Sequence, residues 1–219
     1  GISLLAKLPS IACYAYQSKV HYYDRDSLFI HYANPEYSIA ENFLSLLRKD
    51  QKFSVKEAGL LDTILMLHAD HGGGNNSTFT NVVISSTGTD IYSTMSGSIG
   101  SLKGPRHGGA NIKVAEMMDA VLEDVGGYEA DDSKISRAVE KLIEGELYDR
   151  SGLVYGFGHA VYTISDPRAD MLKACCIAVA KEKNLMTELE FRMRFEQIAR
   201  QVMEQKKGKP LPANVDYYS

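Results

Sequence analysis

The chain of 219 residues has few cysteines and little net charge, and both features exclude classes of protein. Its three cysteines (Cys13, Cys175 and Cys176) form neither a disulfide framework nor a metal-binding spacing, which is typical of a reducing compartment. The formal net charge of −4 is not that of a basic nucleic-acid-binding surface. No apolar run approaches the roughly 18 residues of a membrane span. We therefore expect neither nucleic acid nor membrane as a partner.

Strand-like alternation is also scarce, and helical periodicity takes its place. Apolar stripes predict helices over residues 2–20, 110–124, 133–144, 167–183 and 187–206, with Pro9 as a kink in the first. Two capping-box patterns, Ser38 with Glu41 and Ser54 with Glu57, predict two more helices, the second running as far as Gly72. The fold class is predicted to be all-α, with at most one small hairpin.

The segment 77–101 is rich in serine, threonine and glycine. Asn76 or Ser77 is the predicted cap of one helix here, and Asp90 of another. Small side chains allow two helices to approach closely. This texture fits either tight packing within the chain or a helix–helix interface between two copies, and the sequence leaves both open.

Three histidines stand next to glycines: His71 in HADHGGGN, His107 in GPRHGGAN and His159 in YGFGHAVY. Histidine titrates near neutral pH and can act as an acid, a base or a hydrogen-bond donor. Flanking glycines leave room for a substrate beside the ring. One such histidine is more often a structural helix cap, but three in one chain indicate a site.

Other interpretations of these segments are weaker. His68 and His71 are spaced i, i+3 around Asp70, but no third ligand is evident, so no metal site is predicted. The stretch GGGNNST could bind an anion at a helix N-terminus, but it lacks the lysine and the strand of a phosphate loop. Arg168, which follows Asp166 and Pro167, could present its planar fork to a carboxylate or simply be a surface arginine.

Taken in order, LHADHGGGNNSTFT, GSLKGPRHGGAN, YGFGHAVYTISDPRAD and NVDYYS resemble the citrate synthase family along the whole chain. The resemblance implies a fold of two helical domains. Residues 1–107 would be a large-domain segment with a dimer interface, 108–213 the small domain, and 214–219 the return to the large domain. It also implies a Claisen-type condensation of acetyl-CoA with oxaloacetate, followed by hydrolysis of the citryl thioester to citrate and CoA.

The resemblance implies a role for five side chains. His107 would hydrogen-bond the thioester carbonyl, Asp216 would take the methyl proton, and His159 would protonate the oxaloacetate carbonyl. His71 and Arg168 would bind oxaloacetate. The local pattern around Asp216 does not point to this residue without the resemblance.

Acetyl-CoA is expected as a co-substrate, and no tightly bound cofactor is expected. The resemblance places CoA contacts in the loop made of Val154, Tyr155, Gly156, Phe157 and Gly158. Lys207 and Lys209 could meet the CoA phosphates. A lysine-rich run is also typical of a solvated face. A cytoplasmic homodimer is expected, with a transit peptide ahead of residue 1 left open.

The chain also departs from the family pattern. Family members have a longer N-terminal portion and a further C-terminal stretch with two more substrate-binding arginines, whereas this chain ends three residues after Asp216. We therefore expect both ends to be cut and the chain alone to turn over little. The alternatives are a 2-methylcitrate synthase acting on propionyl-CoA, a helical dimerisation or interaction domain, and a metal-dependent hydrolase built on His68, Asp70 and His71.

Overall fold

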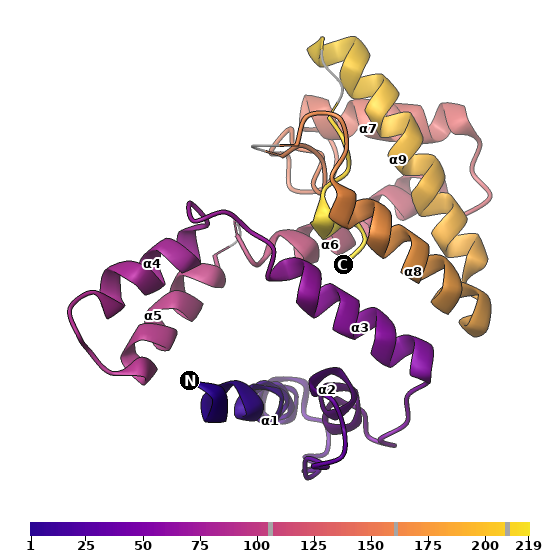
Figure 1. Ribbon diagram of the computed structural model, residues 1–219. Coiled ribbons are helices and arrows are strands. Elements are labelled where there is room, and N and C mark those ends of the chain that lie inside the picture. Colours follow the sequence, from indigo (N-terminus) through magenta and orange to yellow (C-terminus); the bar gives the residue numbers. More distant parts are fainter. Residues whose placement is uncertain (105–106, 160–161, 209–210) are drawn as a thin grey trace. The chain divides into compact units, whose positions relative to one another are not determined.

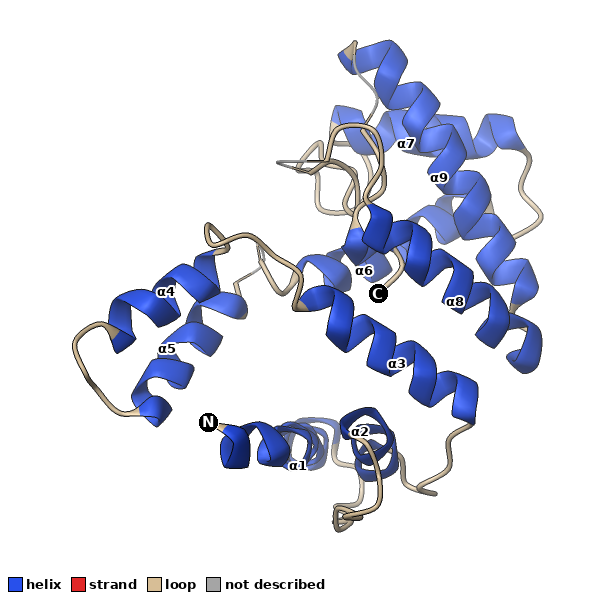
Figure 2. Ribbon diagram, in the orientation of Figure 1, coloured by secondary structure: helices blue, strands red, loops and turns tan. Residues whose placement is uncertain are grey.

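The computed structural model describes residues 1–104, 107–159, 162–208 and 211–219, and its regular elements are helices (Figures 1 and 2). Within these ranges no strand forms, and the β pairing consists of an isolated antiparallel bridge between Phe157 and Ala213. The predicted all-α class is confirmed. The bridge joins two distant segments and is not the local hairpin that the sequence allowed. The chain divides into two compact units, Gly1–Ala69 and Asp70–Ser219.

The first unit contains α1 (Ile2–Lys19), a π-helical turn (Val20–Asp24), α2 (Ile39–Leu47) and α3 (Val55–His68). Both predicted capping boxes are present. The Ser38 hydroxyl accepts a hydrogen bond from the Glu41 N–H, and the Ser54 hydroxyl accepts one from the Glu57 N–H. In each case the glutamate also accepts from the backbone N–H of the serine, so two otherwise unpaired donors are satisfied.

The face of α1 that packs on α2 is narrow. It buries Pro9, Cys13 and Gln17, and Gln17 donates a hydrogen bond of 3.1 Å to the Leu47 carbonyl at the end of α2. The apolar N-terminal end of the helix is exposed instead, and Ile2 is 86% accessible. The helix continues through Pro9 to Lys19 without interruption.

Helix α3 ends at His68, earlier than the sequence indicated. Ala69 is its C-cap, and Asp70 and His71 are no longer helical. The predicted end at Gly72 was wrong because the Asp70 carbonyl accepts a hydrogen bond from the Arg168 guanidinium. A long-range partner thus ends the helix before the glycines.

The second unit begins with two helices that lie side by side, α4 (Asn76–Ser85) and α5 (Ile91–Leu102) (Figure 1). Asp90 caps α5 as predicted, but Asn75 caps α4 rather than Asn76 or Ser77, because its side chain accepts from the N–H three residues later. A Cβ on Gly97 would lie 2.3 Å from the Ile84 side chain. Close packing within the chain therefore accounts for the inner face of this pair.

The remaining helices are α6 (Ala110–Val125), α7 (Asp132–Glu144), α8 (Pro167–Lys183) and α9 (Met186–Lys207), each within one residue of the predicted bounds. Apolar side chains at helical spacing on α6 form its buried face: Val114, Met117, Met118, Val121 and Val125. Ile135 and Leu142 of α7, Leu172 of α8 and Phe195 of α9 are likewise buried. Each contributes roughly 1.5–3 kcal/mol by leaving water.

The division of the chain after residue 107 follows from the two-domain fold that the family resemblance implies. It stays a prediction. The second unit of this structure places residues on both sides of that boundary together.

Candidate functional site

His107 is half-buried just before α6, and its ring is oriented by Ser77. The His107 Nε2 lies 2.9 Å from the Ser77 Oγ and 3.4 Å from the Ser77 backbone nitrogen. A backbone N–H can only donate, so Nε2 accepts and the neutral ring carries its proton on Nδ1. His107 is therefore set up as a neutral donor through Nδ1. The sequence placed Ser77 in a capping role only and did not link it to His107.

The glycine after His107 is required by a close approach. A Cβ on Gly108 would lie 2.7 Å from the Leu102 carbonyl oxygen, which is also the acceptor of the Gly108 N–H at 2.8 Å. The backbone therefore folds back on the end of α5 in a way that a larger residue would prevent. This contact fixes the position of His107 at the start of α6.

A buried ion pair forms the centre of the second cluster. The Arg168 Nε and Nη2 donate to the two carboxylate oxygens of Asp166 at 2.9 and 2.8 Å, and Asp166 also caps α8 through the Arg168 N–H. Burial raises the pKa of Asp166, but the hydrogen bonds and charge of Arg168 outweigh burial, so this pKa lies below its usual value. Arg168 is only 8% exposed, so it is not a surface arginine.

Asp166 also holds the segment that contains Asp216. Its Oδ2 accepts a hydrogen bond of 3.2 Å from the backbone N–H of Val215. The sequence indicated a helix cap at Asp166 but not this second bond, which joins residues 49 positions apart. No local signal could have revealed it.

The Arg168 guanidinium faces two further groups. Its Nη1 donates to the Asp70 carbonyl at 2.8 Å, and its Nη2 lies 3.1 Å from the His159 Nε2. The Tyr162 ring lies 5.6 Å from the guanidinium carbon, within reach of a cation–π contact. Arg168 therefore joins the residue before His71 to the ring of His159.

His159 has a donor against each ring nitrogen. The Tyr162 N–H donates to Nδ1 at 3.1 Å, while Arg168 stands against Nε2. A neutral imidazole has one N–H and one acceptor, so it satisfies only one of these two donors at a time. The tautomer of His159 therefore depends on which of the two contacts is kept.

The segments of His159 and Asp216 are joined by the Phe157–Ala213 bridge. The Gly158 N–H donates to the Pro212 carbonyl at 2.7 Å, and the Asn214 N–H donates to the Gly156 carbonyl at 2.8 Å. The Asn214 side chain adds a bond of 2.9 Å to the Gly158 carbonyl. Backbone pairing thus brings together two parts of the chain that the sequence listed as separate motifs.

Asp216 lies in a short 3₁₀ turn, Val215–Tyr217, between two buried residues. The Asn214 side chain accepts the Asp216 N–H at 3.1 Å, and the Tyr217 hydroxyl donates to the Arg192 carbonyl at 2.7 Å. Burial raises the pKa of Tyr217 well above its usual value. The contacts of Asn214 and Tyr217 therefore fix the backbone on both sides of Asp216, which is itself half-buried.

The remaining residues predicted to contact substrate or CoA make fewer contacts with the clusters described above. His71 is exposed, and its Nε2 lies 3.3 Å from the Thr78 hydroxyl. In the loop expected to meet CoA, Val154 and Gly156 are buried, Phe157 and Tyr155 are half-buried, and the Gly158 N–H is already bonded. Lys207 is the last residue of α9, and the structure describes its backbone but not its side chain. Lys209 lies outside the described residues.

A metal site and a membrane span can both be compared with the described part of the chain. No group of three or more histidine, cysteine, aspartate or glutamate side chains there could hold a metal ion. His68 instead bonds the Ile64 carbonyl of its own helix at 2.8 Å. None of the helices described is both long and apolar enough to cross a membrane.

Comparison with known proteins identifies the family. The chain matches the family model described as citrate synthase, C-terminal domain, over residues 1–219. A citrate synthase of Haloferax volcanii is 36% identical over 99% of this chain and 50% of its own length. A 2-methylcitrate synthase of Shewanella oneidensis is 36% identical over 78% of this chain and 40% of its own.

The solved structures agree. The crystal structure of citrate synthase from Thermotoga maritima superposes with a TM-score of 0.67 at 30% identity, covering 96% of this chain and 50% of that one. The chain thus spans about half the length of the curated relatives it matches. It belongs to the citrate synthase family.

Proposed function

We propose that this chain carries the groups that condense acetyl-CoA with oxaloacetate and then hydrolyse the citryl thioester to citrate and CoA. The observation that carries the proposal is the contact between Ser77 and the His107 Nε2, which leaves a proton on Nδ1. A neutral N–H donor is what a developing enolate oxygen needs, because the donor is in place before the charge appears.

In the proposed reaction the Asp216 carboxylate removes a proton from the thioester methyl while the His107 Nδ1–H donates to the thioester oxygen. The resulting enolate carbon attacks the ketone carbon of oxaloacetate, and His159 gives a proton to the ketone oxygen. Water then attacks the citryl thioester, releasing CoA as the thiol. Acetyl-CoA acts as a co-substrate rather than a resident cofactor.

Binding of oxaloacetate would change the contacts of Arg168. A substrate carboxylate at Nη2 would replace His159 there, and it would free the His159 Nε2 to hold the proton that the ketone receives. His71 is proposed as a second ligand of oxaloacetate. The exchange of one contact for another couples substrate binding to the tautomer of His159.

The test uses the whole polypeptide that the gene encodes, with thiol release measured against both substrates. His107→Asn is expected to lower kcat by about 100- to 1000-fold, because the donor to the enolate is lost. The matched control His21→Asn changes an exposed histidine outside the cluster and should leave kcat unchanged. Near-normal kcat in His107→Asn would overturn the proposal.

A second candidate is the condensation of propionyl-CoA with oxaloacetate, which the likeness to a 2-methylcitrate synthase favours. Both reactions use the same proton transfers, so the residues above do not separate them. The ratio of kcat/KM for acetyl-CoA and propionyl-CoA decides between them. A ratio well above one supports citrate synthase, and a ratio below one supports 2-methylcitrate synthase.

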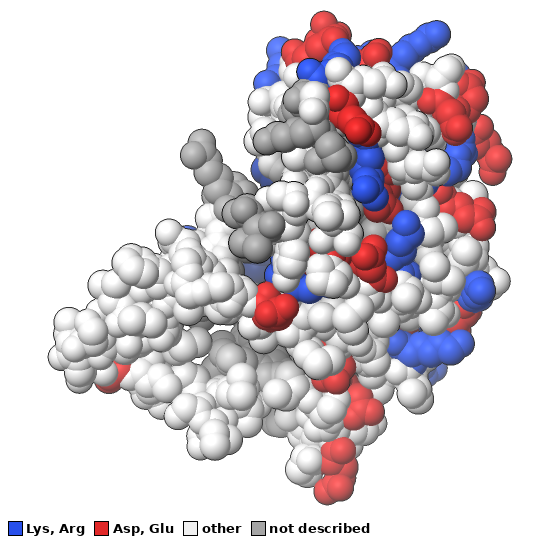
Figure 3. Space-filling model, turned by 45° about the horizontal axis from the view of Figure 1, so that its top comes forward, with Lys and Arg blue, Asp and Glu red and all other residues white. Residues whose placement is uncertain are grey.

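We also propose that two copies associate through the outer face of α4 and α5. Residues 76–102 contain one charged residue, Asp90, and the surface there is nearly uncharged (Figure 3). Phe79 and Val82 are each 59% exposed, which is unusual for large apolar side chains close together. Light scattering on the wild type and Val82→Asp tests this, since a monomeric wild type contradicts it. We further propose that the protein is located in the cytoplasm, which cell fractionation would test.

A further inference from the structure

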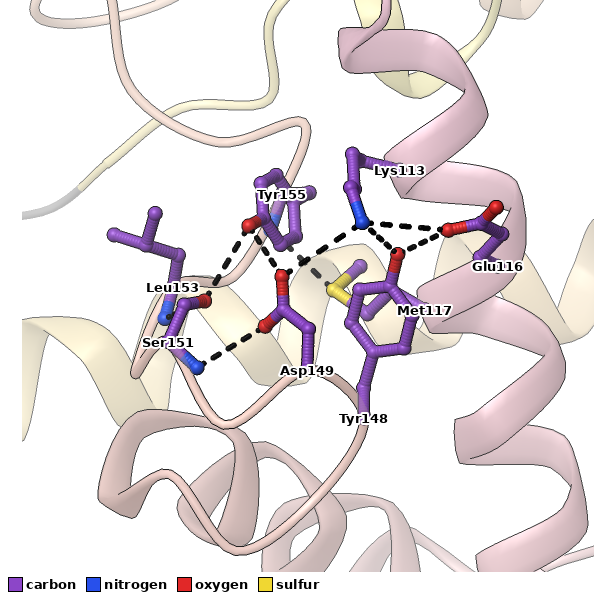
Figure 4. A network of polar contacts seen from close by, with 8 residues as sticks. All are labelled: Lys113, Glu116, Met117, Tyr148, Asp149, Ser151, Leu153 and Tyr155. Atoms are coloured by element: carbon purple, nitrogen blue, oxygen red, sulfur yellow. Dashed lines mark hydrogen bonds and ion pairs between the residues drawn. The ribbon is translucent and has the colours of Figure 1, made fainter. Parts of the chain in front are cut away.

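A network of polar contacts connects the first turns of α6 to the loop that precedes the Val154–Gly158 segment (Figure 4). On the side of α6, the Lys113 Nζ donates to the Tyr148 hydroxyl at 2.9 Å, and that hydroxyl donates to the Glu116 carboxylate. The hydrogen bond that Lys113 donates to Tyr148 is the main cause that raises the pKa of Lys113. Tyr148 is thus held from the helix by a cation and an anion together.

Asp149 continues the network toward Tyr155. The Tyr155 hydroxyl donates to the Asp149 Oδ2 at 2.6 Å, and the Lys113 Nζ lies 4.0 Å from the same oxygen. Burial raises the pKa of Asp149, but hydrogen bonds from Ser151 and Tyr155 outweigh burial and bring this pKa below its usual value. Asp149 is therefore an ionised acceptor. It lies between Lys113 and Tyr155 (Figure 4).

The loop takes an unusual backbone path to make these contacts. Tyr148 and Arg150, on either side of Asp149, have φ angles of +62° and +57°. Residues with a Cβ seldom occupy this left-handed region, and surrounding contacts must hold them there. The backbone on both sides of Asp149 is thus bent so that its carboxylate meets Tyr155.

Tyr155 begins the segment that leads to His159. Its backbone N–H faces the Met117 sulfur on α6 at 3.3 Å, and the next residue, Gly156, packs against Val114 of the same helix. Beyond it, the Gly158 N–H is bonded to Pro212. Lys113 lies six positions after His107, and Tyr155 lies four positions before His159. The network therefore ties the chain segment of one histidine to that of the other.

We propose that Lys113, Asp149 and Tyr155 are positioning residues, which keep the Tyr155–His159 segment in register with the helix that follows His107. They act through the backbone of the segment that leads to His159. The proposal rests on the proposed function for its effect on turnover, but its structural part stands without that function.

The variants Tyr155→Phe and Asp149→Asn, made singly and together in the whole polypeptide, test this. We expect each single variant to lower kcat by roughly tenfold with little change in the KM for oxaloacetate, because the acid His159 is displaced. The KM for acetyl-CoA should rise, because its contacts are expected in the same segment. The double variant should be no slower than the slower single one, because both changes weaken the same contact between the Tyr155 hydroxyl and the side chain at position 149. The control Tyr128→Phe changes a phenol that makes no hydrogen bond with the described residues and should keep the wild-type kcat.

Hydrogen exchange of the Gly158 amide supplies a readout that does not need turnover. It should become about tenfold faster in Tyr155→Phe and in Asp149→Asn, and stay unchanged in Tyr128→Phe. Unchanged exchange in both variants overturns the proposal whether or not the protein is active. If the parent has no condensation activity, the proposed function fails and exchange alone decides the inference. If the parent is active, an unchanged kcat in folded variants also overturns it.

Discussion

Replacing Gly156 by alanine should destabilise the second unit through two separate effects. Gly156 has a φ of +81°, and the left-handed region costs a residue with a Cβ about 1–2 kcal/mol. The added Cβ would lie 2.9 Å from the Tyr217 ring and 3.0 Å from the Val114 side chain. Tyr217 is buried and bonded to Arg192, so it cannot move easily, and overpacking adds about 1–3 kcal/mol. We expect a total loss of about 2–5 kcal/mol.

The measurement is urea unfolding followed by far-UV circular dichroism, with Gly126→Ala as the matched control. Gly126 has a φ of +84°, and nothing lies within 4 Å of the Cβ position. The control therefore carries the backbone effect alone, about 1–2 kcal/mol. Equal losses in the two variants would refute the argument that packing of Tyr217 against Gly156 holds the bridge segment.

Three further changes test the fold and the ion pair. Ser54→Ala removes one capping box and should reduce the stability of the first unit by about 1 kcal/mol in urea unfolding, and no loss would contradict the capping role. Leu172→Ala leaves a cavity at a fully buried site and should cost about 2–5 kcal/mol, while a loss below that of Ser54→Ala would show that the site collapses. Asp166→Asn leaves Arg168 buried without its anion and should cost about 3–5 kcal/mol at neutral pH. The pKa of Asp166 is lowered from 3.8, so its stabilisation is full above that pH and is lost as the pH falls below it. The deficit of Asp166→Asn should therefore shrink in acid, and a deficit that does not vary with pH would contradict the ion pair.

Much of the fold could be predicted because its signals are local. The capping boxes at Ser38 and Ser54 and the apolar stripes of α6 and α7 depend on residues three or four positions apart. Helices α6 to α9 accordingly begin and end within one residue of the prediction. The errors arose where a distant partner intervened. Helix α3 ends early because Arg168 binds the Asp70 carbonyl, and Ser77 faces His107 rather than capping α4.

The candidate site likewise has features that the sequence predicts and features that depend on distant partners. The glycine-flanked histidines and the order of the motifs could be read in the chain, and the family match agrees with that interpretation. The roles of the individual side chains stay predictions. Ser77 and the second bond of Asp166 had no local signal, since their partners lie 30 and 49 positions away.

The sequence by itself determined the helical class, most of the helix boundaries and the family, because these follow from spacing and from ordered motifs. Only the tertiary structure decided which hydrogen bonds orient the site residues. The Ser77 N–H assigns the His107 proton to Nδ1, and the Phe157–Ala213 bridge sets the His159 segment beside that of Asp216. Such contacts depend on how distant segments pack, and the spacing of neighbouring residues does not predict that packing.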